Sequence, residues 1–485
     1  MAVAVKVVIA DKIIPRVLYN SHMIRTRIAP SPTGADVHVG SVATALMNYA
    51  WAKKNNGQFI IRIEDTDRTR IVEGGEVQML KTLKRIGLVA DESPEVGGPY
   101  APYRQSERLD IYKKYAEELV AKGKAYYCIC TPERLTKMRN EQQAKKQIPK
   151  YDRLCLANQN EIIQQIKDKK ISHVIRLLIP EGQIKFNDAV RGEIIIDTQN
   201  IDDQVILKSD GFPTYHLGVV IDDYLMKITH VIRGEEWLPS TPKHIILYRA
   251  FGWEPPVFAH ISLLRNPDKS KLSKRKNPVW TSYYLDQGIF QETLLNYLAL
   301  MGWSHPDGKD IFSLEEYIKV FDIKDIQTSA PVFDPVKLEW MNGMYIREMK
   351  NEELKMKIFK FIDEKYPEKL IERTIPLIKE RIKKLSDYLP MCEFFLKAPE
   401  IYEVDISGKK EFFQQVHVEL EKLIDWRADL IGEALVNLAK KLEIKNSIFF
   451  ADMRMVITGK KISPPLNESM EILGKDECLK RLTLR

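Results

Sequence analysis

The chain has 485 residues, of which 44% are hydrophobic and 29% charged; this balance is typical of a folded protein of several domains and excludes an intrinsically disordered chain. No apolar run approaches the roughly 18–20 residues that a membrane-spanning helix needs, so a membrane protein is not expected. The formal net charge of +7 permits a polyanionic partner without requiring one.

The first regular elements form a strand, a turn, a helix and a second strand. Residues 24–28 form a strand-like run that stops at Pro30-Ser31-Pro32-Thr33-Gly34, residues 42–54 are predicted to be helical, and residues 59–63 to form a buried strand. This order within about 40 residues predicts a βαβ unit and therefore a parallel sheet. Residues 1–22 show no secretory signal and are interpreted as an N-terminal extension or as the result of a mis-set start.

The later elements indicate two kinds of architecture. A helix is predicted over residues 100–120, and buried strands over residues 172–178, 194–196 and within 221–233. Amphipathic helical stretches then dominate from about residue 352: they cover residues 352–362, 371–385, 411–425 and 428–441, with a last one after Pro464-Pro465 that ends near Arg481. These patterns predict an α/β domain followed by a separate all-helical C-terminal region.

The first candidate motif, His38-Val39-Gly40-Ser41, follows the first strand and its Pro/Gly loop, where the helix opens. At this point of a βα unit, free backbone N–H groups and the positive end of the helix dipole face a bound anion. Gly40 allows close approach of a nucleotide, and His38 is able to donate a hydrogen bond to a phosphate oxygen. A lone histidine here more often caps or packs, so this motif alone predicts little.

The second candidate motif is Lys271-Leu272-Ser273-Lys274-Arg275, which Lys276 extends. Cations that meet the β- and γ-phosphates of a nucleotide as charge builds up stabilise the transition state of phosphoryl transfer. Seen alone, the motif is more often a basic surface loop.

Charged residues also follow two predicted strands. Glu64 lies in Arg62-Ile63-Glu64-Asp65-Thr66-Asp67, and Arg233 lies in Val231-Ile232-Arg233-Gly234-Glu235-Glu236-Trp237. The carboxyl ends of strands are the usual ligand edge of an open α/β sheet. Glu64 is expected to accept hydrogen bonds from an ammonium group, and Arg233 to bind a carboxylate. The alternatives are a helix cap formed by residues 65–67 and a structural ion pair of Arg233.

Positive charge and cysteines concentrate in one inserted stretch. Residues 131–176 contain 11 lysines and arginines against 5 acidic residues, which indicates either a solvated face or a polyanion-binding surface. Cys128, Cys130 and Cys155 belong to the same part of the chain and would form a tetrahedral zinc site with one further oxygen or nitrogen ligand; the alternative is that they are simply buried. The chain has only five cysteines, which indicates a reducing compartment. Cys392 and Cys478 are expected to be buried in helix cores.

Together these strings resemble the glutamyl-tRNA synthetases, a family of class I aminoacyl-tRNA synthetases of the bacterial type. Residues 27–34 with His38-Val39-Gly40 are similar to the family's HIGH signature, and residues 271–275 to its KMSKS signature. The stretches 62–67, 231–236 and 341–346 are also characteristic of it. The resemblance extends from Met23 to the C-terminus. It implies ATP-dependent ligation of L-glutamate to the 3′ end of tRNA(Glu) through a glutamyl-adenylate, with Mg²⁺ accompanying the nucleotide.

The resemblance also implies roles for individual residues. His38, Gly40, Lys271, Ser273 and Lys274 would contact the phosphates of ATP, and His38, Gly40, Lys271 and Lys274 would carry the catalysis. Adenosine would be contacted by Glu236 and Leu264. Glutamate would be held by Arg27, Ala29, Ser31, Glu64, Tyr215 and Arg233. A buried arginine is the expected selector for glutamate, because glutamine would leave it unpaired at a cost of roughly 2–5 kcal/mol.

For the domains, the resemblance implies a Rossmann-like catalytic domain with an inserted acceptor-stem-binding domain and a helical anticodon-binding domain. The expected divisions are 1–22 (extension), 23–100 and 211–265 (catalytic halves), 101–210 (insertion), 266–350 (KMSKS loop and stem-contact region) and 351–485 (anticodon-binding domain). Some members bind zinc with a tyrosine ligand, and since no histidine closely follows Cys155, Tyr151 would be the fourth ligand. The protein is expected to be a cytoplasmic monomer.

Four alternatives are weighed against this assignment. Glutaminyl-tRNA synthetase is disfavoured because the C-terminal region is helical. The short relative that modifies a tRNA base is disfavoured because it lacks such a region. An inactive tRNA-binding protein is disfavoured by the intact His38, Lys274, Glu64 and Arg233. A generic nucleotidyltransferase is disfavoured by the anticodon-like region. Whether tRNA(Gln) is also charged stays open.

Overall fold

The structure of the protein, a computed structural model, describes residues 23–272 and 278–483. The predicted extension, and Ser273, Lys274 and Arg275 of the basic motif, therefore lie outside the described residues. Within the described ranges, no helix is both long and apolar enough to cross a membrane.

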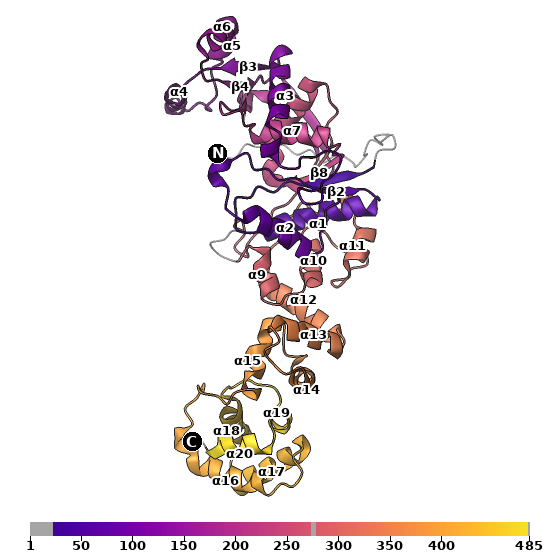
Figure 1. The fold of residues 1–485 in the computed structure, drawn as a ribbon, viewed down its shortest axis with the longest axis vertical. Coiled ribbons are helices and arrows are strands. Elements are labelled where there is room, and N and C mark those ends of the chain that lie inside the picture. Colours follow the sequence, from indigo (N-terminus) through magenta and orange to yellow (C-terminus); the bar gives the residue numbers. More distant parts are fainter. Residues whose placement is uncertain (1–22, 273–277, 484–485) are drawn as a thin grey trace. The chain divides into compact units, whose positions relative to one another are not determined.

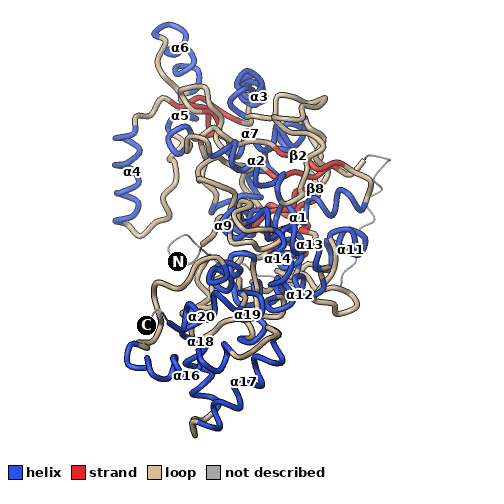
Figure 2. The backbone as a smooth tube through the Cα atoms, turned by 60° about the horizontal axis from the view of Figure 1, so that its bottom comes forward, coloured by secondary structure: helices blue, strands red, loops and turns tan. Residues whose placement is uncertain are grey.

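The chain forms two compact units, each described here by itself. Unit 1 consists of Met1–Tyr283 and Leu294–Asp334, and unit 2 of Tyr284–Thr293 and Pro335–Arg485. The strands of the described residues all belong to unit 1, whereas unit 2 is built from helices and loops (Figure 2). This confirms the predicted fold class, an α/β region followed by a helical C-terminal region.

The βαβ unit is present at the start of unit 1 (Figure 1). Strand β1 (Arg25–Ile28) pairs in parallel with β2 (Gln58–Ile61), and helix α1 (Val39–Lys54) connects them. The helix begins three residues earlier than residue 42, because the side chain of His38 caps it. The apolar residues of α1 and β2 are buried, as the hydrophobic pattern predicts.

A second pair of parallel strands lies beside β1. Strand β8 (His230–Gly234) pairs with β9 (Val257–Ile261), and helix α8 (Thr241–Phe251) lies between them in the chain. The backbone N–H of Thr229, just before β8, donates to the carbonyl of Arg25 in β1 at 2.9 Å. The carboxyl ends of β1, β2 and β8 therefore face the same side, where a ligand is expected in an open α/β sheet.

The inserted region contains two antiparallel arrangements. Strands β3, β4 and β7 form one sheet, and the hairpin of β5 and β6 joins the parallel pair through a parallel bridge between Asp188 and Phe258. The bounds are β3 (Ala125–Cys128), β4 (Val174–Leu177), β5 (Gln183–Asp188), β6 (Gly192–Asp197) and β7 (Val205–Leu207). Its helices are α3 (Leu109–Ala121), α4 (Pro132–Ala144), α5 (Leu154–Ala157) and α6 (Gln159–Lys169), and α7 (Tyr215–Leu225) follows. One hydrophobic core joins α3, α7, α8 and these strands.

The helix predicted over residues 100–120 is wrong in its first half. Helix α3 begins only at Leu109. Before it, the carbonyl of Tyr103 accepts from the N–H of Ile63, and the N–H of Gln105 donates to the carbonyl of Ile63. These strand-like hydrogen bonds use backbone groups that a helix would need, and Pro102 has no N–H to donate within a helix.

Unit 2 contains two hydrophobic cores. Its helices are α12 (Pro335–Glu348), α13 (Asn351–Phe361), α14 (Glu368–Ile378), α15 (Tyr388–Cys392), α16 (Lys410–Glu421), α17 (Ala428–Lys441), α18 (Asn446–Thr458), α19 (Leu466–Leu473) and α20 (Lys475–Thr483). Helices α13 and α17 match the prediction closely, whereas α14 and α16 end several residues earlier than predicted. Cys392 and Cys478 are fully buried in these cores, as expected.

The remaining helices lie between these parts in the chain. Helix α11 (Leu314–Val320) belongs to unit 1, whereas α9 (Thr281–Asp286) and α10 (Gln291–Ala299) each contain residues of both units.

Candidate active site

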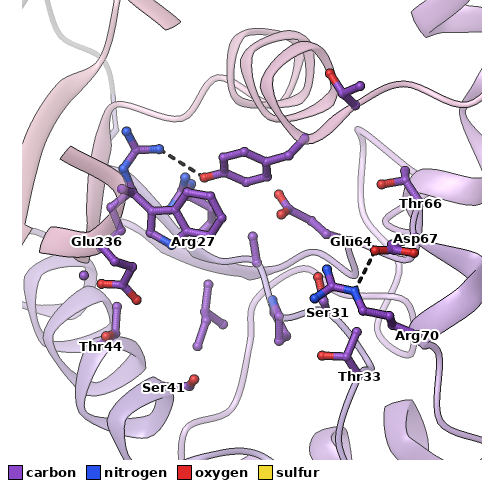
Figure 3. Close-up of a pocket in the computed structure, with 18 of the residues that line it drawn as sticks. Arg27, Ser31, Thr33, Ser41, Thr44, Glu64, Thr66, Asp67, Arg70 and Glu236 are labelled. Carbon is purple, nitrogen blue, oxygen red and sulfur yellow. Dashed lines mark hydrogen bonds and ion pairs between the residues drawn. The ribbon is translucent and has the colours of Figure 1, made fainter. Parts of the chain in front are cut away.

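A cavity of about 730 Å³ lies at the carboxyl ends of β1, β2 and β8 (Figure 3). Seven of the residues predicted to bind substrates line it: Arg27, Ala29, Ser31, Glu64, Tyr215, Arg233 and Glu236. They come from three strand ends and from the first residue of α7, so the parallel sheet brings together positions that are up to about 200 residues apart in the chain. The cavity is therefore the first candidate for a substrate-binding site.

Arg27 belongs to a buried ion-pair network on the cavity wall. Its guanidinium donates to both carboxylate oxygens of Asp223, at 3.1 and 3.2 Å, and Arg62 donates to the same carboxylate at 2.8 Å. Burial raises the pKa of Asp223, but the charges of Arg27 and Arg62 outweigh this effect and hold the pKa below its ordinary value. The charge of Arg27 is thus already balanced by a protein carboxylate.

Glu64 lies beside this network and points toward the cavity (Figure 3). One of its oxygens accepts a hydrogen bond from Arg62 at 3.1 Å. Burial raises the pKa of Glu64 to about 7, because the charges of Arg62 and Arg27 only partly offset the loss of solvation. Glu64 is therefore a carboxylate that a bound ammonium group would stabilise strongly.

Arg233 differs from Arg27 in its partners. Its side chain is 5% exposed, and it donates to Tyr215, Thr241 and His260 at 2.9–3.2 Å. All three partners are uncharged acceptors, and no carboxylate of the described residues lies within ion-pair distance of its guanidinium. A buried cation without a counter-ion costs free energy, which a bound anion removes. Arg233 is therefore the group in the cavity that most clearly requires an acidic ligand.

The start of α1 has the geometry of an anion site. The Nδ1 atom of His38 accepts the backbone N–H of Gly40 at 2.9 Å, which closes the helix as an N-cap. Since Nδ1 accepts, the proton of the neutral ring is on Nε2, where it acts as a donor. The capping interpretation and the phosphate-binding interpretation of His38 are therefore compatible.

The chain on both sides of residues 273–277 is tied to this helix start. After them, the N–H of Val39 donates to the carbonyl of Val279 at 2.9 Å, and the N–H of Thr281 donates to the carbonyl of Val37 at 3.1 Å. Before them, the N–H of Leu272 donates to the carbonyl of Leu264 at 3.2 Å. A Cβ atom built on Gly40 would lie 3.9 Å from Leu264. The described residues that flank 273–277 thus lie beside the first motif, although about 230 residues separate the two segments in the chain.

Four predicted residues of the described chain do not line the cavity itself: His38, Gly40, Leu264 and Lys271. Ser41 and Thr44, from the first turns of α1, do line it (Figure 3). The cavity therefore adjoins the start of α1 and the strand end at Leu264. Ser273 and Lys274 lie outside the described residues.

Sequence reasoning missed several residues of the cavity wall. Thr66, Asp67, Arg70, Lys208 and Trp237 line it. Asp67 precedes a short 3-10 helix, Arg68–Arg70, but its carboxylate accepts from the side chains of Thr69 and Arg70 and not from the backbone. The expected cap by Asp67 is therefore wrong in its contacts. For Thr66, Asp67 and Arg70, the position shortly after β2, beside Glu64, was the available signal.

The cysteine cluster forms a second candidate site within unit 1. The sulfur of Cys130 lies 3.5 Å from that of Cys155, and the hydroxyl of Tyr151 lies 3.3 Å from Cys130 and 3.5 Å from Cys128. Tetrahedral zinc with Zn–S bonds of about 2.3 Å places its sulfur ligands about 3.8 Å apart. The four predicted donor atoms thus converge as a zinc site requires, and Cys128, Cys130 and Cys155 form the metal-compatible cluster of the described residues.

Two arginines supply positive charge to this cluster. Arg134 approaches the sulfur of Cys130 at 3.4 Å, and the guanidinium of Arg176 lies 4.1 Å from the centre of the Tyr151 ring. Three thiolates and a zinc ion carry a net negative charge, which these cations offset.

Comparisons with known proteins agree on the kind of protein that this chain resembles. Residues 23–340 match the family model of class I tRNA synthetases (E and Q), catalytic domain, and residues 345–484 match an anticodon binding domain. The chain is 45% identical over 479 residues to a glutamate–tRNA ligase of Acidothermus cellulolyticus, covering 95% of this chain and 94% of that protein. It is 47% identical over 462 residues to a glutamate–tRNA ligase of Marinomonas sp., covering 93% of each.

Solved structures give the same result. A glutamate tRNA ligase from Elizabethkingia meningosepticum, crystallised in complex with its amino acid, superposes with a TM-score of 0.83 at 37% identity and covers 95% of this chain and 98% of its own. The glutamate-tRNA synthetase of Elizabethkingia anophelis gives a TM-score of 0.82 at 37% identity, over 95% of this chain and 99% of that one.

Proposed function

The chain belongs to the glutamate–tRNA ligase family of class I tRNA synthetases, and on that premise we propose that the cavity at the ends of β1, β2 and β8 binds glutamate. The protein joins glutamate to tRNA for translation. The observation that supports the proposed site is that one cavity contains both a buried arginine and a buried carboxyl group, each able to bind a ligand group of opposite charge. Among residues 23–272 and 278–483, no carboxylate pairs with Arg233, and Glu64 is a buried acid whose pKa is raised to about 7. An amino acid with an acidic side chain supplies both missing charges.

In the proposed arrangement, Glu64 binds the ammonium group, and Arg233 with Tyr215 binds the side-chain carboxylate. Arg27, Ala29 and Ser31 shape the wall around the amino acid. ATP binds where α1 begins, with its phosphates at His38 and Gly40, with Lys271, Ser273 and Lys274 beside them, and with adenosine at Glu236 and Leu264. Mg²⁺ is expected to bind through the phosphate oxygens of ATP.

The reaction requires no protein nucleophile. The α-carboxylate of glutamate attacks the α-phosphorus of ATP, the bond to the β-phosphate oxygen breaks, and pyrophosphate leaves with the negative charge. A ribose hydroxyl of the terminal adenosine of tRNA, expected to be the 2′-OH, then attacks the glutamyl carbonyl and releases AMP. The residues of the site act by position and charge. Arg70 and Lys208 on the cavity wall provide positive charge for the entering 3′ end.

The charge of Glu64 gives the site a testable pH dependence. Since burial raises its pKa to about 7, Glu64 is ionised above that pH and progressively neutral below it. We expect kcat/KM for glutamate to fall as the pH decreases from 8 to 6, by roughly tenfold per unit once the pH is below the pKa. The variant Glu64→Gln should lower kcat/KM for glutamate and should no longer show this decrease between pH 8 and 6.

Steady-state aminoacylation at fixed ATP and tRNA measures this effect. Glu76→Gln is a matched control, because Glu76 pairs with Arg104 at 2.8 Å and does not line the cavity. If Glu64→Gln retains the same decrease between pH 8 and 6, the titrating group is a different one.

We also propose that Cys128, Cys130, Cys155 and Tyr151 hold a zinc ion. When bound, it would tie the end of β3 to α5 and to the chain just before α5, and it would serve as a structural cross-link. Protein purified without chelators is expected to contain about one zinc per chain by elemental analysis. Cys130→Ser should lose the metal and lower the thermal midpoint of unfolding. Cys392→Ser, which changes a buried cysteine of unit 2, should retain the zinc ion. Wild-type protein with well under one zinc per chain refutes the site.

For the macromolecular partner, we propose tRNA(Glu). Residues 101–210, which contain the basic stretch 131–176, are proposed to bind the acceptor stem. The stretch 266–350 is proposed to contact the stem next to it, and residues 351–485 to bind the anticodon. A monomeric, cytoplasmic enzyme is part of this proposal. Aminoacylation of purified tRNA(Glu) and tRNA(Gln) with glutamate decides whether the second tRNA is also charged.

A further inference from the structure

Behind Arg233 lies a buried chain of polar side chains from four different elements. His244 comes from α8, His260 from β9, His216 from α7 and Asp188 from the end of β5. Each is at most 7% exposed. The Nε atom of Arg233 lies 3.0 Å from Nε2 of His260, and both terminal nitrogens of Arg233 lie 3.3 Å from Nδ1 of His244. Arg233 is thus held by imidazole nitrogens where a carboxylate would be the usual partner.

The hydrogen bonds determine which nitrogen of each ring carries a proton. Arginine only donates, so Nε2 of His260 and Nδ1 of His244 must both present lone pairs. His260 then carries its proton on Nδ1, which faces Oδ2 of Asp188 at 2.6 Å. His244 carries its proton on Nε2, which faces Nδ1 of His216 at 3.0 Å. Every ring has one tautomer that satisfies its neighbours, and Asp188 selects that of His260.

The other oxygen of Asp188 is committed to the backbone. Oδ1 accepts from the N–H of Val190 at 3.0 Å and from the N–H of Arg191 at 2.9 Å. The turn between β5 and β6 therefore fixes the orientation of the carboxylate. Only Oδ2 is directed at the ring of His260.

Both histidines that contact Arg233 are held neutral. Burial lowers the pKa of His244 well below its ordinary value, and the charge of Arg233 lowers it further. Burial also lowers the pKa of His260, although the hydrogen bond to Asp188 opposes this. The neutral rings orient the guanidinium of Arg233 without neutralising its charge.

We propose that Asp188 and His260 are positioning residues for glutamate: Asp188 keeps His260 in the Nδ1–H tautomer, and His260 holds Arg233 as an oriented cation that pairs with no carboxylate of the described residues. This inference rests on the proposed role of Arg233 in binding the side-chain carboxylate. It assigns a specificity function to a residue of the inserted region that does not line the cavity. A carboxylate in place of either histidine would neutralise Arg233 and remove its preference for an acidic substrate.

The variant Asp188→Asn tests this assignment, because it retains shape and removes only the charge and one acceptor. The amide oxygen has to stay at the position of Oδ1, where Val190 and Arg191 donate, so the amide N–H₂ faces His260. His260 must then move its proton to Nε2, and that N–H points at the N–H of Arg233. We expect KM for glutamate to rise about tenfold or more, with KM for ATP within about twofold of wild type.

Two variants of His260 complete the test. His260→Phe keeps a ring but offers no acceptor, and it should raise KM for glutamate as Asp188→Asn does. His260→Gln places an amide oxygen near the position of Nε2, and it should recover most of the loss. Histidine-selective ¹⁵N NMR of the full chain should show the Nδ1–H tautomer for His260 in the wild type and the Nε2–H tautomer in Asp188→Asn.

Asp203→Asn is the matched control, since Asp203 is a buried carboxylate of the same inserted region, 3% exposed, and does not contact Arg233. An unchanged KM for glutamate in both Asp188→Asn and His260→Phe overturns the inference, as does an equal rise in Asp203→Asn. Arg233→Ala separates the two levels of the argument. If it leaves KM for glutamate unchanged, the proposed substrate site fails; if it raises KM while Asp188→Asn and His260→Phe do not, only the positioning role fails.

Discussion

Arg233→Ala should reduce kcat/KM for glutamate by about 10²–10³-fold while KM for ATP stays within about twofold. The expected loss corresponds to about 3–4 kcal/mol, the range found when one partner of a buried charge pair is removed. The physical reason is that Arg233 is buried and that its hydrogen-bond partners in the described part of the chain are uncharged. A substrate carboxylate therefore does not compete with a described protein carboxylate for Arg233. Aminoacylation kinetics at varied glutamate and varied ATP measure both constants.

Folding should survive this substitution, because no carboxylate that the structure describes loses its ion-pair partner. Arg249→Ala is the matched control: Arg249 lies on α8, is exposed, and donates to the carbonyl of Lys185. Arg233→Lys should be intermediate, since lysine keeps the charge but loses the planar fork. A variant Arg233→Ala that saturates with glutamate as the wild type does would contradict the assignment.

Arg27→Ala is expected to damage glutamate use as well, but its result is harder to interpret. Arg27 shares the carboxylate of Asp223 with Arg62. Removing Arg27 leaves Asp223 with one arginine fewer in a buried position, so stability and substrate binding change together. Arg233 is therefore the cleaner test of acidic specificity.

Lys274→Ala should lower the rate of aminoacylation by about 10²–10³-fold, with tRNA affinity nearly unchanged. The expected magnitude is that of removing one preorganised donor from a developing negative charge. Lys274 lies outside the described residues, but the chain is tied to the start of α1 by Val279 and to Leu264 by Leu272. The described residues on both sides of this segment are therefore held near Gly40, where the phosphates are proposed to bind.

Pyrophosphate exchange in the presence of tRNA and a separate tRNA-binding titration distinguish the two effects. Lys269→Ala is the control, because Lys269 is an exposed lysine just before the basic motif. An equal loss of rate and of tRNA affinity in Lys274→Ala would indicate a binding or folding role instead.

Local patterns were sufficient to predict the parts of the fold that depend on local interactions. The βαβ unit around α1, the strand before Glu64 and the helices α13 and α17 follow from hydrophobic periodicity and stop signals. The helix expected from residue 100 was wrong because bonds to Ile63, about 40 residues away, decide that backbone. Periodicity carries no information about such partners.

The same limit applies to the site. The residues proposed to bind substrates followed from strand ends and from the family resemblance, and seven of them line one cavity. The sequence did not indicate that Asp223 neutralises Arg27 and that histidines surround Arg233, because those partners lie up to 196 residues away. The difference between the two arginines is a property of burial and pairing, which only the three-dimensional structure contains.

A crystal structure of the protein with glutamate and a non-hydrolysable ATP analogue tests the central claim most directly. We expect the side-chain carboxylate of glutamate within hydrogen-bond distance of Arg233, its ammonium group at Glu64, and the triphosphate at the start of α1. Glutamate bound with its side chain away from Arg233, or a nucleotide bound away from Gly40, would contradict it.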